Sequence, residues 1–237
     1  MKVEISETKQ QVAQNFSRYL ADFIASKNES HVALSGGSTP KIVFDQLARN
    51  YANKIDWGKA HLYWGDERCV PPTDADSNYK MTVDHLLSKI NIPKANVHRI
   101  KGENNPEYEA ERYSKLLGKE LPKKNKIPSF DLVILGMGDD GHTASIFPHE
   151  IGLWDSKDYC EIAEHPQSGQ QRVTITGQII NNATEVVLLV TGLSKAEKVR
   201  EIINREGDYK DYPASLVAPR SENLVWFLDG TAADGIT

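Results

Sequence analysis

The fold is indicated most clearly by residues 132–142, which read LVILGMGDDGH. This segment begins with four apolar residues in a row and then changes abruptly to glycine, aspartate and histidine. Continuous rather than alternating hydrophobicity is typical of a strand buried on both faces, as in a parallel sheet. We therefore expect residues 132–135 to form an internal strand, and residues 136–142 to form the loop at its carboxyl end.

The same pattern occurs elsewhere in the chain. Short apolar runs that lead into Gly, Ser, Thr or Asp cover residues 32–34, 62–64, 186–190 and 224–228. Between the runs, apolar residues at helical spacing predict helices over residues 7–26, 40–49, 78–90, 106–118 and 194–204. Strands that alternate with helices indicate a layered α/β domain. Because open sheets of this kind bind ligands at the carboxyl ends of their strands, the polar residues after each run are candidates for a functional site.

Composition and charge exclude several classes of protein. The 237 residues carry 28 Lys and Arg against 33 Asp and Glu, a formal net charge of −5, which argues against bulk nucleic-acid binding. The longest unbroken apolar run, Val186–Val190, is far too short to cross a bilayer. Two cysteines, Cys69 and Cys160, cannot form a disulfide framework, and with no signal-like start we expect a cytoplasmic protein. The length suits a single domain over residues 1–237.

An anion-binding loop is predicted after the first run, in residues 35–40, SGGSTP. Thr39 can cap the helix that follows, and Pro40 suits its first turn. The two glycines let the backbone approach a ligand, and the exposed amides at a helix N-terminus favour phosphate. A tight turn with a good cap explains the same residues equally well. The Gly-Lys-Ser/Thr ending of a Walker A loop is missing.

The loop after residues 132–135 contains a candidate general base. Residues 136–141 match the dinucleotide fingerprint, but Asp139 and Asp140 would place negative charge where a pyrophosphate must lie. Asp140 and His142 lie two apart, where a carboxylate can orient an imidazole, and an oriented neutral histidine is a good base near pH 7. A purely structural hydrogen bond between them is the alternative. We expect no metal, because no His-x-x-x-His or Cys-x-x-Cys spacing occurs.

Three cations complete the set of candidates. Arg68 follows a strand in Gly65-Asp66-Glu67-Arg68 and could stabilise an oxyanion, with Asp66 or Glu67 holding it in place. A surface cluster of salt bridges is the alternative. Lys195 at the start of a helix opposes the helix dipole, which a bound anion would explain. Arg172 lies in a predicted strand; it could be an ordinary exposed arginine, or could surround one phosphate together with Lys195 and the loop at residues 35–39.

These segments together resemble the 6-phosphogluconolactonase family, within the glucosamine-6-phosphate isomerase/6-phosphogluconolactonase superfamily. The matching stretches are SGGSTP (35–40), WGDERCVPPTDADSNY (64–79), LGMGDDGHTASIFP (135–148), RVTIT (172–176), TGLSKAEKV (191–199) and YPASLV (212–217). The resemblance implies a Rossmann-like three-layer α/β sandwich with a mostly parallel central sheet. It also implies hydrolysis of 6-phospho-D-glucono-1,5-lactone to 6-phospho-D-gluconate in the oxidative pentose phosphate pathway, without a metal or cofactor.

The resemblance assigns roles to individual residues. His142 looks like the base that activates water, with Asp140 as its neighbour. Arg68 looks like the residue that contacts the lactone carbonyl or the attacking water, and Asp66 lies in the same catalytic motif. The implied phosphate-binding residues are Ser35, Gly36, Gly37, Ser38, Thr39, Arg172 and Lys195. The expected partner is a phosphorylated sugar lactone, with no nucleic acid and no membrane, and the chain is expected to be a monomer.

Three rival functions share parts of this pattern. The deaminase/isomerase branch of the superfamily is similar at residues 140–142, but carries Glu where this chain has Phe147 and Tyr where it has Arg68, which favours the lactonase. A non-catalytic sugar-phosphate sensor would keep the phosphate loop but would not need His142 and Arg68. A serine hydrolase would need a Gly-x-Ser-x-Gly elbow, which the sequence lacks.

Overall fold

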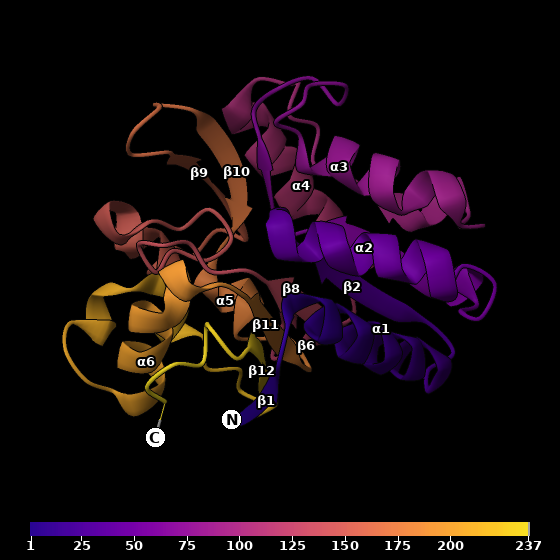
Figure 1. Cartoon of the computed structure of the whole chain (residues 1–237). Coiled ribbons are helices and arrows are strands. Elements are labelled where there is room, and N and C mark those ends of the chain that lie inside the picture. The colour runs from indigo at the N-terminus through magenta and orange to yellow at the C-terminus, as the bar shows by residue number, and fades with distance from the viewer. Residues whose placement is uncertain (237) are drawn as a thin grey trace.

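A parallel sheet forms the centre of the computed structural model, which describes residues 1–236 (Figure 1). Within these residues, the sheet has seven strands in the order β1-β12-β11-β8-β2-β3-β5, and neighbouring strands pair in parallel. Its strands are β1 (Lys2–Ser6), β2 (Ser30–Leu34), β3 (Ala60–Trp64), β5 (Val97–His98), β8 (Leu132–Leu135), β11 (Val186–Val190) and β12 (Leu224–Asp229). All five apolar runs therefore form strands of this sheet, as predicted.

Burial explains why the runs are continuously apolar. Every residue of β2, β8 and β11 is buried, because helices cover both faces of the sheet. The two strands that the pattern missed lie at the sheet edges. β1 alternates charged and apolar residues and is largely accessible, and β5 spans only Val97–His98. An edge strand has no need of continuous apolar sequence.

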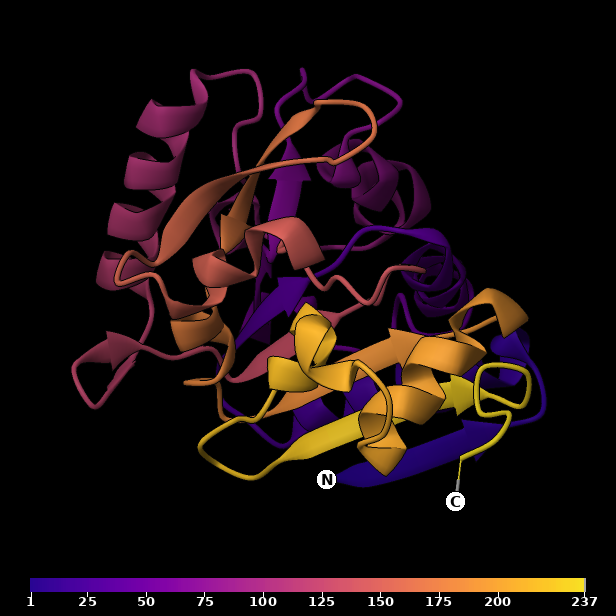
Figure 2. The same ribbon diagram turned by 90° about the vertical axis from the view of Figure 1, so that its left-hand side faces the viewer.

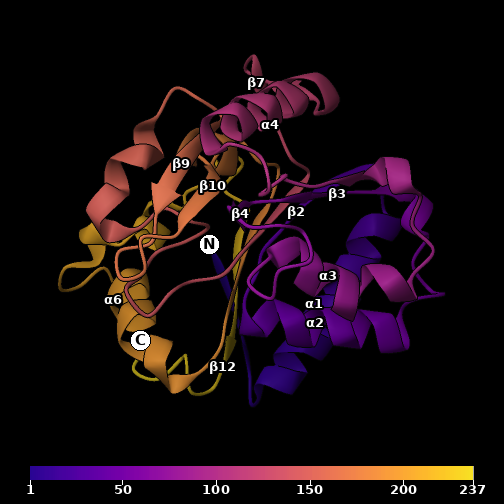
Figure 3. The same cartoon turned by 90° about the horizontal axis from the view of Figure 1, so that it is seen from above.

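The molecule has three layers (Figure 3). One face of the sheet is covered by α1 (Lys9–Ala25), α2 (Ser38–Asn50) and α3 (Asn78–His85). On the opposite side lie α4 (Pro106–Glu120) and α6 (Ala196–Asn204), as Figure 3 shows, and the short α5 (Gly177–Ile180) follows the strand that ends at Ile175. The predicted Rossmann-like three-layer α/β sandwich is confirmed. Short 3₁₀ helices occur at Trp57–Lys59, Leu87–Lys89, Lys94–Asn96, Pro148–Asp155, Leu193–Lys195, Tyr209–Asp211 and Pro213–Leu216. Among residues 1–236, no helix combines the length and apolar character that crossing a bilayer requires.

Two small sheets are added to this core (Figure 2). The first is antiparallel, in the order β4-β10-β9, with β4 (Asp66–Arg68), β9 (Cys160–Glu164) and β10 (Gln171–Ile175). Helix α4 packs against β9 and β10. The second is a hairpin of β6 (Lys123–Lys124) and β7 (Ile127–Pro128). The first sheet matters for function, because it pairs Arg68 directly with Arg172.

The strand order reverses between β2 and β8. From β2 the chain continues to β3 and β5 on one side, whereas from β8 it continues to β11 and β12 on the other. Loops that leave two neighbouring strands in opposite directions open a crevice, and ligands bind there in open α/β sheets. The loops at this switch point are residues 35–37 and 136–142, the two that the sequence marked as phosphate loop and base.

Three histidines form a column across β2, β3 and β5, with His31 and His61 near the amino ends of their strands. His31 and His61 are register partners, and their rings lie 5.1 Å apart. His61 Nδ1 lies 3.2 Å from His98 Nε2. Burial lowers the pKa of His31 and of His98, and the charge of His61 lowers both further. Carboxylates near the column oppose this effect without reversing it: Glu29, Glu120 and Asp131.

This column predicts a loss of stability in acid. Because folding depresses the pKa of His31 and His98, the unfolded chain binds their protons more readily, so the free energy of unfolding should decrease as the pH falls below ~6.5. His98→Phe can keep the ring stacked on Tyr63, at 4.4 Å, but cannot be protonated. We expect its free energy of unfolding, measured by urea denaturation, to decrease less between about pH 7.5 and 5.5 than that of the wild type.

The matched control for this experiment is His149→Gln, since the His149 side chain is 45% exposed. This control should follow the wild-type pH dependence. If His98→Phe also follows it, the histidine column does not set the acid sensitivity.

Candidate active site

The phosphate loop leads from β2 into α2. The helix begins at Ser38, and its N-cap is Gly37 at a φ of 105°, a conformation that favours glycine. The prediction that Thr39 caps the helix is wrong. Its hydroxyl instead lies 2.8 Å from the Thr191 hydroxyl, in the loop after β11, because the helix starts at Ser38, two residues before the start that a cap at Thr39 requires. Pro40 lies in the first turn, as predicted.

His142 is oriented by Asp140. Its Nδ1 lies 2.6 Å from Asp140 Oδ1, and the same carboxylate oxygen accepts its main-chain N–H over 3.1 Å. Burial alone would raise the pKa of Asp140, but the hydrogen bond to His142 and the charge of the imidazole lower it to about 2. An ionised Asp140 accepts a hydrogen bond from the protonated Nδ1 of His142. The other ring nitrogen, Nε2, then keeps the lone pair that a general base needs.

Phe147 packs against the same imidazole. Its ring centroid lies 4.6 Å from that of His142, and the Arg172 guanidinium lies 5.4 Å from the same phenyl ring. Phe147 is buried. An apolar ring therefore stands beside the candidate base and separates part of it from solvent.

Arg68 and Arg172 lie opposite one another across β4 and β10. The Arg68 Nη1 donates to the main-chain carbonyl of Asp76, and Arg172 Nη1 donates to Ser145 Oγ over 3.4 Å. In the part of the chain that the structure describes, the Nε of each arginine is buried without a hydrogen-bond partner. Burial lowers the pKa of Arg172. Two guanidiniums with donors to spare at one site are suited to an anionic ligand.

The two carboxylates beside Arg68 play different structural roles. Glu67 is 2% exposed and accepts the main-chain N–H groups of Arg68, Asn78 and Tyr79, over 2.7–2.8 Å. Burial raises the pKa of Glu67, and these hydrogen bonds act against that rise. Glu67 thus holds the backbone of Arg68 and not its guanidinium.

Asp66 is tied to the opposite side of the site. It is 5% exposed, and Ser145 Oγ donates to its Oδ2 over 2.6 Å. Asn78 Nδ2 donates to its Oδ1 over 3.3 Å. Because Ser145 also accepts from Arg172, Asp66 reaches Arg172 through one hydroxyl.

Lys195 meets an anion of the chain itself. It stands at the N-cap of α6, and its Nζ lies 2.6 Å from Asp139 Oδ1. Lys195 lowers the pKa of Asp139 through this hydrogen bond. Asp139 therefore explains the position of Lys195 at the helix N-terminus even without a ligand. Because the Asp139 side chain is 71% exposed, a ligand anion can replace it as the partner of Lys195.

One pocket of about 240 Å³ gathers nearly all the predicted residues. Its walls include the whole loop at residues 35–39, together with Asp66, Arg68, His142, Arg172 and Lys195. Asp140 lies behind His142 and does not line the pocket. Segments that are more than 150 residues apart in sequence thus meet at the switch point of the sheet.

Three further residues belong to this site, although the sequence reading did not single them out. Asn78 and Thr191 line the pocket, and Ser145 connects Asp66 with Arg172. In the sequence, Asn78 is marked only as the first residue of the helix expected over residues 78–90, and in the structure Ser77 is the N-cap of that helix, α3. The close approach of Asn78 explains Gly36, where a Cβ would lie 1.9 Å from Asn78 Oδ1. Residues 1–236 contain no group of three or more His, Cys, Asp or Glu arranged to hold a metal ion.

Comparisons with known proteins agree on one family. The model of the family "Glucosamine-6-phosphate isomerases/6-phosphogluconolactonase" matches residues 4–226. The chain is 44% identical over 203 residues to the 6-phosphogluconolactonase of Haemophilus influenzae, covering 85% of each chain. It is 44% identical over 194 residues to that of Treponema pallidum, covering 78% of this chain and 80% of the relative. The solved structure of 6-phosphogluconolactonase from Trypanosoma brucei superposes with a TM-score of 0.90 at 29% identity, covering 100% of this chain and 98% of the other.

Proposed function

This chain belongs to the glucosamine-6-phosphate isomerase/6-phosphogluconolactonase family, and from that premise we infer that it is a lactonase, which hydrolyses 6-phosphogluconolactone in the pentose phosphate pathway. The observation that carries this assignment is that His142, oriented by Asp140 from behind, lines the same pocket as Arg68, with further cations around it. A base, an oxyanion donor and an anion-binding region in one crevice are what hydrolysis of a phosphorylated lactone requires.

The phosphate of the substrate is bound away from the reacting carbon. The N-terminal amides of α2, in the loop at residues 35–39, donate to the phosphate oxygens, and Arg172 and Lys195 supply charge. Lys195 exchanges Asp139 for the phosphate when substrate enters. Binding of the phosphate fixes the position of the sugar ring. The free energy of phosphate binding is therefore used to place C1 next to His142.

His142 carries the proton through both steps of the reaction. Its Nε2 accepts a proton from water as the water oxygen forms a bond to C1, and the carbonyl electrons move onto the oxygen that Arg68 stabilises. When the tetrahedral intermediate collapses, the bond from C1 to the ring oxygen breaks. His142 then donates its proton to that ring oxygen, and the new carboxylic acid ionises to give 6-phosphogluconate. Asp140 stabilises the imidazolium between the two steps, and Asp66 keeps Arg172 in place through Ser145.

Phe147 argues against the isomerase branch of the family. Ring opening and amine isomerisation need a further acid–base group beside the histidine, where this chain has a phenyl ring 4.6 Å from the imidazole. An apolar ring cannot transfer a proton. The chemistry available at this site is therefore addition of water and loss of the ring oxygen.

The chain is proposed to act as a cytoplasmic monomer with a single domain. The residues that line the pocket, at positions 35–195, come together at the switch point of one sheet, which supports a single domain. Both cysteines are free thiols, which suits a reducing compartment.

The test of this function is turnover of freshly generated 6-phosphogluconolactone, followed by rapid mixing with a pH indicator. We expect the protein to release acid far faster than spontaneous hydrolysis, and to release no ammonia from glucosamine 6-phosphate. Gluconolactone without the phosphate is the matched control, and it should be hydrolysed poorly because it lacks the remote binding group. Ammonia release, or no acceleration over the spontaneous rate, would show that the assignment is wrong.

A further inference from the structure

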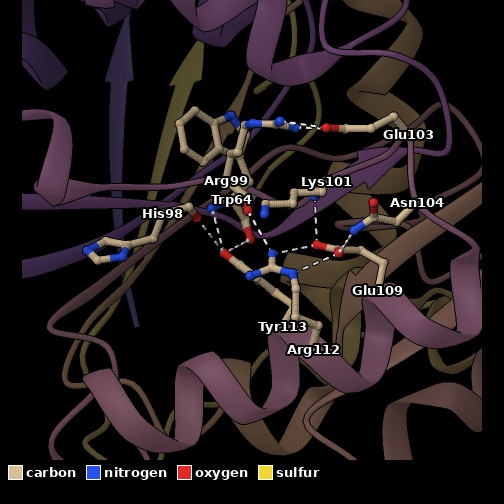
Figure 4. A network of polar contacts seen from close by, with 9 residues as sticks. All are labelled: Trp64, His98, Arg99, Lys101, Glu103, Asn104, Glu109, Arg112 and Tyr113. Atoms are coloured by element: carbon tan, nitrogen blue, oxygen red, sulfur yellow. Dashed lines mark hydrogen bonds and ion pairs between the residues drawn. The ribbon is translucent and has the colours of Figure 1, made fainter.

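A buried ionic network lies outside the pocket (Figure 4). Its centre is Glu109 of α4, whose side chain is 1% exposed. The Glu109 carboxylate accepts the main-chain N–H of Lys101 over 2.6 Å and Asn104 Nδ2 over 2.8 Å. Arg112 donates to both carboxylate oxygens, from Nε over 2.8 Å and from Nη2 over 2.6 Å. Because a buried carboxylate is costly unless fully paired, a network satisfied in this way favours a single geometry.

This network holds one turn, residues 101–104, against helix α4. The turn is closed by a hydrogen bond from Asn104 N to Lys101 O over 2.9 Å. Arg112 Nη2 also donates to the carbonyl of Arg99, just before the turn, over 3.1 Å. Both flanks of the turn are therefore attached to the same helix, as the dashed lines in Figure 4 show.

The same helix also holds the end of β3. The hydroxyl of Tyr113 donates to the carbonyl of Trp64 and accepts its main-chain N–H, each over 3.0 Å. Trp64 is the last residue of β3, two residues before β4 begins. Helix α4 thus holds both the turn and the strand that leads to Arg68 in fixed positions relative to each other.

Gly102, inside this turn, lies directly against the backbone of Arg68. A Cβ at Gly102 would be 2.2 Å from the Arg68 carbonyl oxygen and 2.7 Å from that of Val70. On its other side, the backbone of Arg68 pairs with Arg172 of β10. The main chain of Arg68 is therefore enclosed between β10 and the turn, and no side chain larger than hydrogen fits at Gly102 without a shift.

We propose that Gly102 and Glu109 are positioning residues for Arg68, an inference that rests on the proposed lactonase function. Among the described residues, the guanidinium of Arg68 makes a single hydrogen bond within the protein, to the carbonyl of Asp76, and its Nε has no partner. Because so few side-chain contacts hold the guanidinium, its position depends largely on where the backbone of Arg68 lies. Glu109 fixes the turn, Gly102 transmits that position to Arg68, and neither residue lines the pocket.

The primary test compares two glycine substitutions. Gly102→Ala should displace the Arg68 backbone and lower kcat for the lactone by about 10²-fold, the cost of a ~1 Å misplacement, with little change in KM. Gly152→Ala is the matched control, because a Cβ there meets no atom within 4 Å, and it should leave kcat and KM unchanged. Wild-type kcat in Gly102→Ala would overturn the inference, as would a loss that appears only in KM.

A double-mutant cycle tests whether the effect passes through Arg68. When Arg68→Met is already present, Gly102→Ala should cost little further activity, because the guanidinium that it displaces is gone. If Gly102→Ala costs the same factor in both backgrounds, Gly102 acts independently of Arg68 and the inference fails.

Two further measurements keep the inference testable if Gly102→Ala does not fold or if the wild type does not hydrolyse the lactone. Asn104→Ala removes one donor to Glu109 while keeping Gly102, so it should lower kcat in the same direction by a smaller factor even where Gly102→Ala does not fold. Unchanged kcat in Asn104→Ala would then overturn the inference. A crystal structure of a folded variant locates Arg68 without relying on activity. A displaced Arg68 supports the positioning role even if the wild type proves not to hydrolyse the lactone, and an unmoved Arg68 refutes it.

Discussion

Replacing His142 by alanine is expected to lower kcat/KM for lactone hydrolysis by about 10²–10⁴-fold, the usual contribution of a general base. The loss should appear chiefly in kcat, because the phosphate-binding residues remain in place. The fold should persist. His142 lies in a loop after β8, its side chain is 25% exposed, and its hydrogen bonds from the side chain and main chain go to its neighbour Asp140.

The measurement is rapid kinetics on freshly generated lactone, with circular dichroism to show that the variant is folded. His149→Ala is the matched control, since its ring also lies near Phe147, at 5.9 Å, but its carboxylate partner Glu150 is 3.7 Å away and it does not line the pocket. This control should keep wild-type turnover. If His142→Ala keeps it as well, His142 is not the base, and the proposed mechanism must be abandoned.

Replacing Arg68 by methionine has the second-largest expected effect. We expect kcat to fall by roughly 10²–10³-fold, as when a donor to a developing oxyanion is removed. KM should change less, because Arg68 is assigned to the reacting carbonyl and not to the phosphate. Stability should be affected little, since within residues 1–236 the guanidinium makes one hydrogen bond, to the carbonyl of Asp76, and Glu67 holds the backbone independently of the side chain.

Arg172→Met is the informative comparison for that variant. Arg172 lies opposite Arg68 in the register of β4 and β10, but is assigned to the phosphate, so its loss should raise KM more than it lowers kcat. Arg68→Lys keeps the charge without the planar fork and should recover only part of the activity. The same kcat and KM pattern in Arg68→Met and Arg172→Met would contradict the separate roles proposed for them.

The fold was predictable to a large extent, because burial leaves a direct trace in sequence. Strands enclosed on both faces must be continuously apolar, so residues 132–135 and 186–190 could be identified as parts of a parallel sheet. The edge strand β1, at Lys2–Ser6, escaped detection because one of its sides faces water. The end of α3 at His85 was also missed, since the apolar spacing continues into a separate 3₁₀ helix at Leu87–Lys89.

The candidate site was predictable where a motif was local. Asp140 and His142 are two residues apart, so the turn alone brings them together, and their hydrogen bond could be anticipated from the sequence. Ser145 could not be found in this way. It donates a hydrogen bond to Asp66, which is 79 positions away, and no sequence pattern in either segment indicates this contact.

The sequence by itself determined the apolar strands, the helices between them, and the polar residues placed at the carboxyl ends of the strands, because these follow from local periodicity and from chain order. Only the tertiary structure decided that β2 lies beside β8, that Arg68 faces Arg172, and that Gly102 lies against the backbone of Arg68. The physical reason is that strands of similar apolar composition can pair with one another equally well, so their sequences do not specify which strands become neighbours. Their order is chosen by the packing of the whole chain, and the contacts within the site follow from that order.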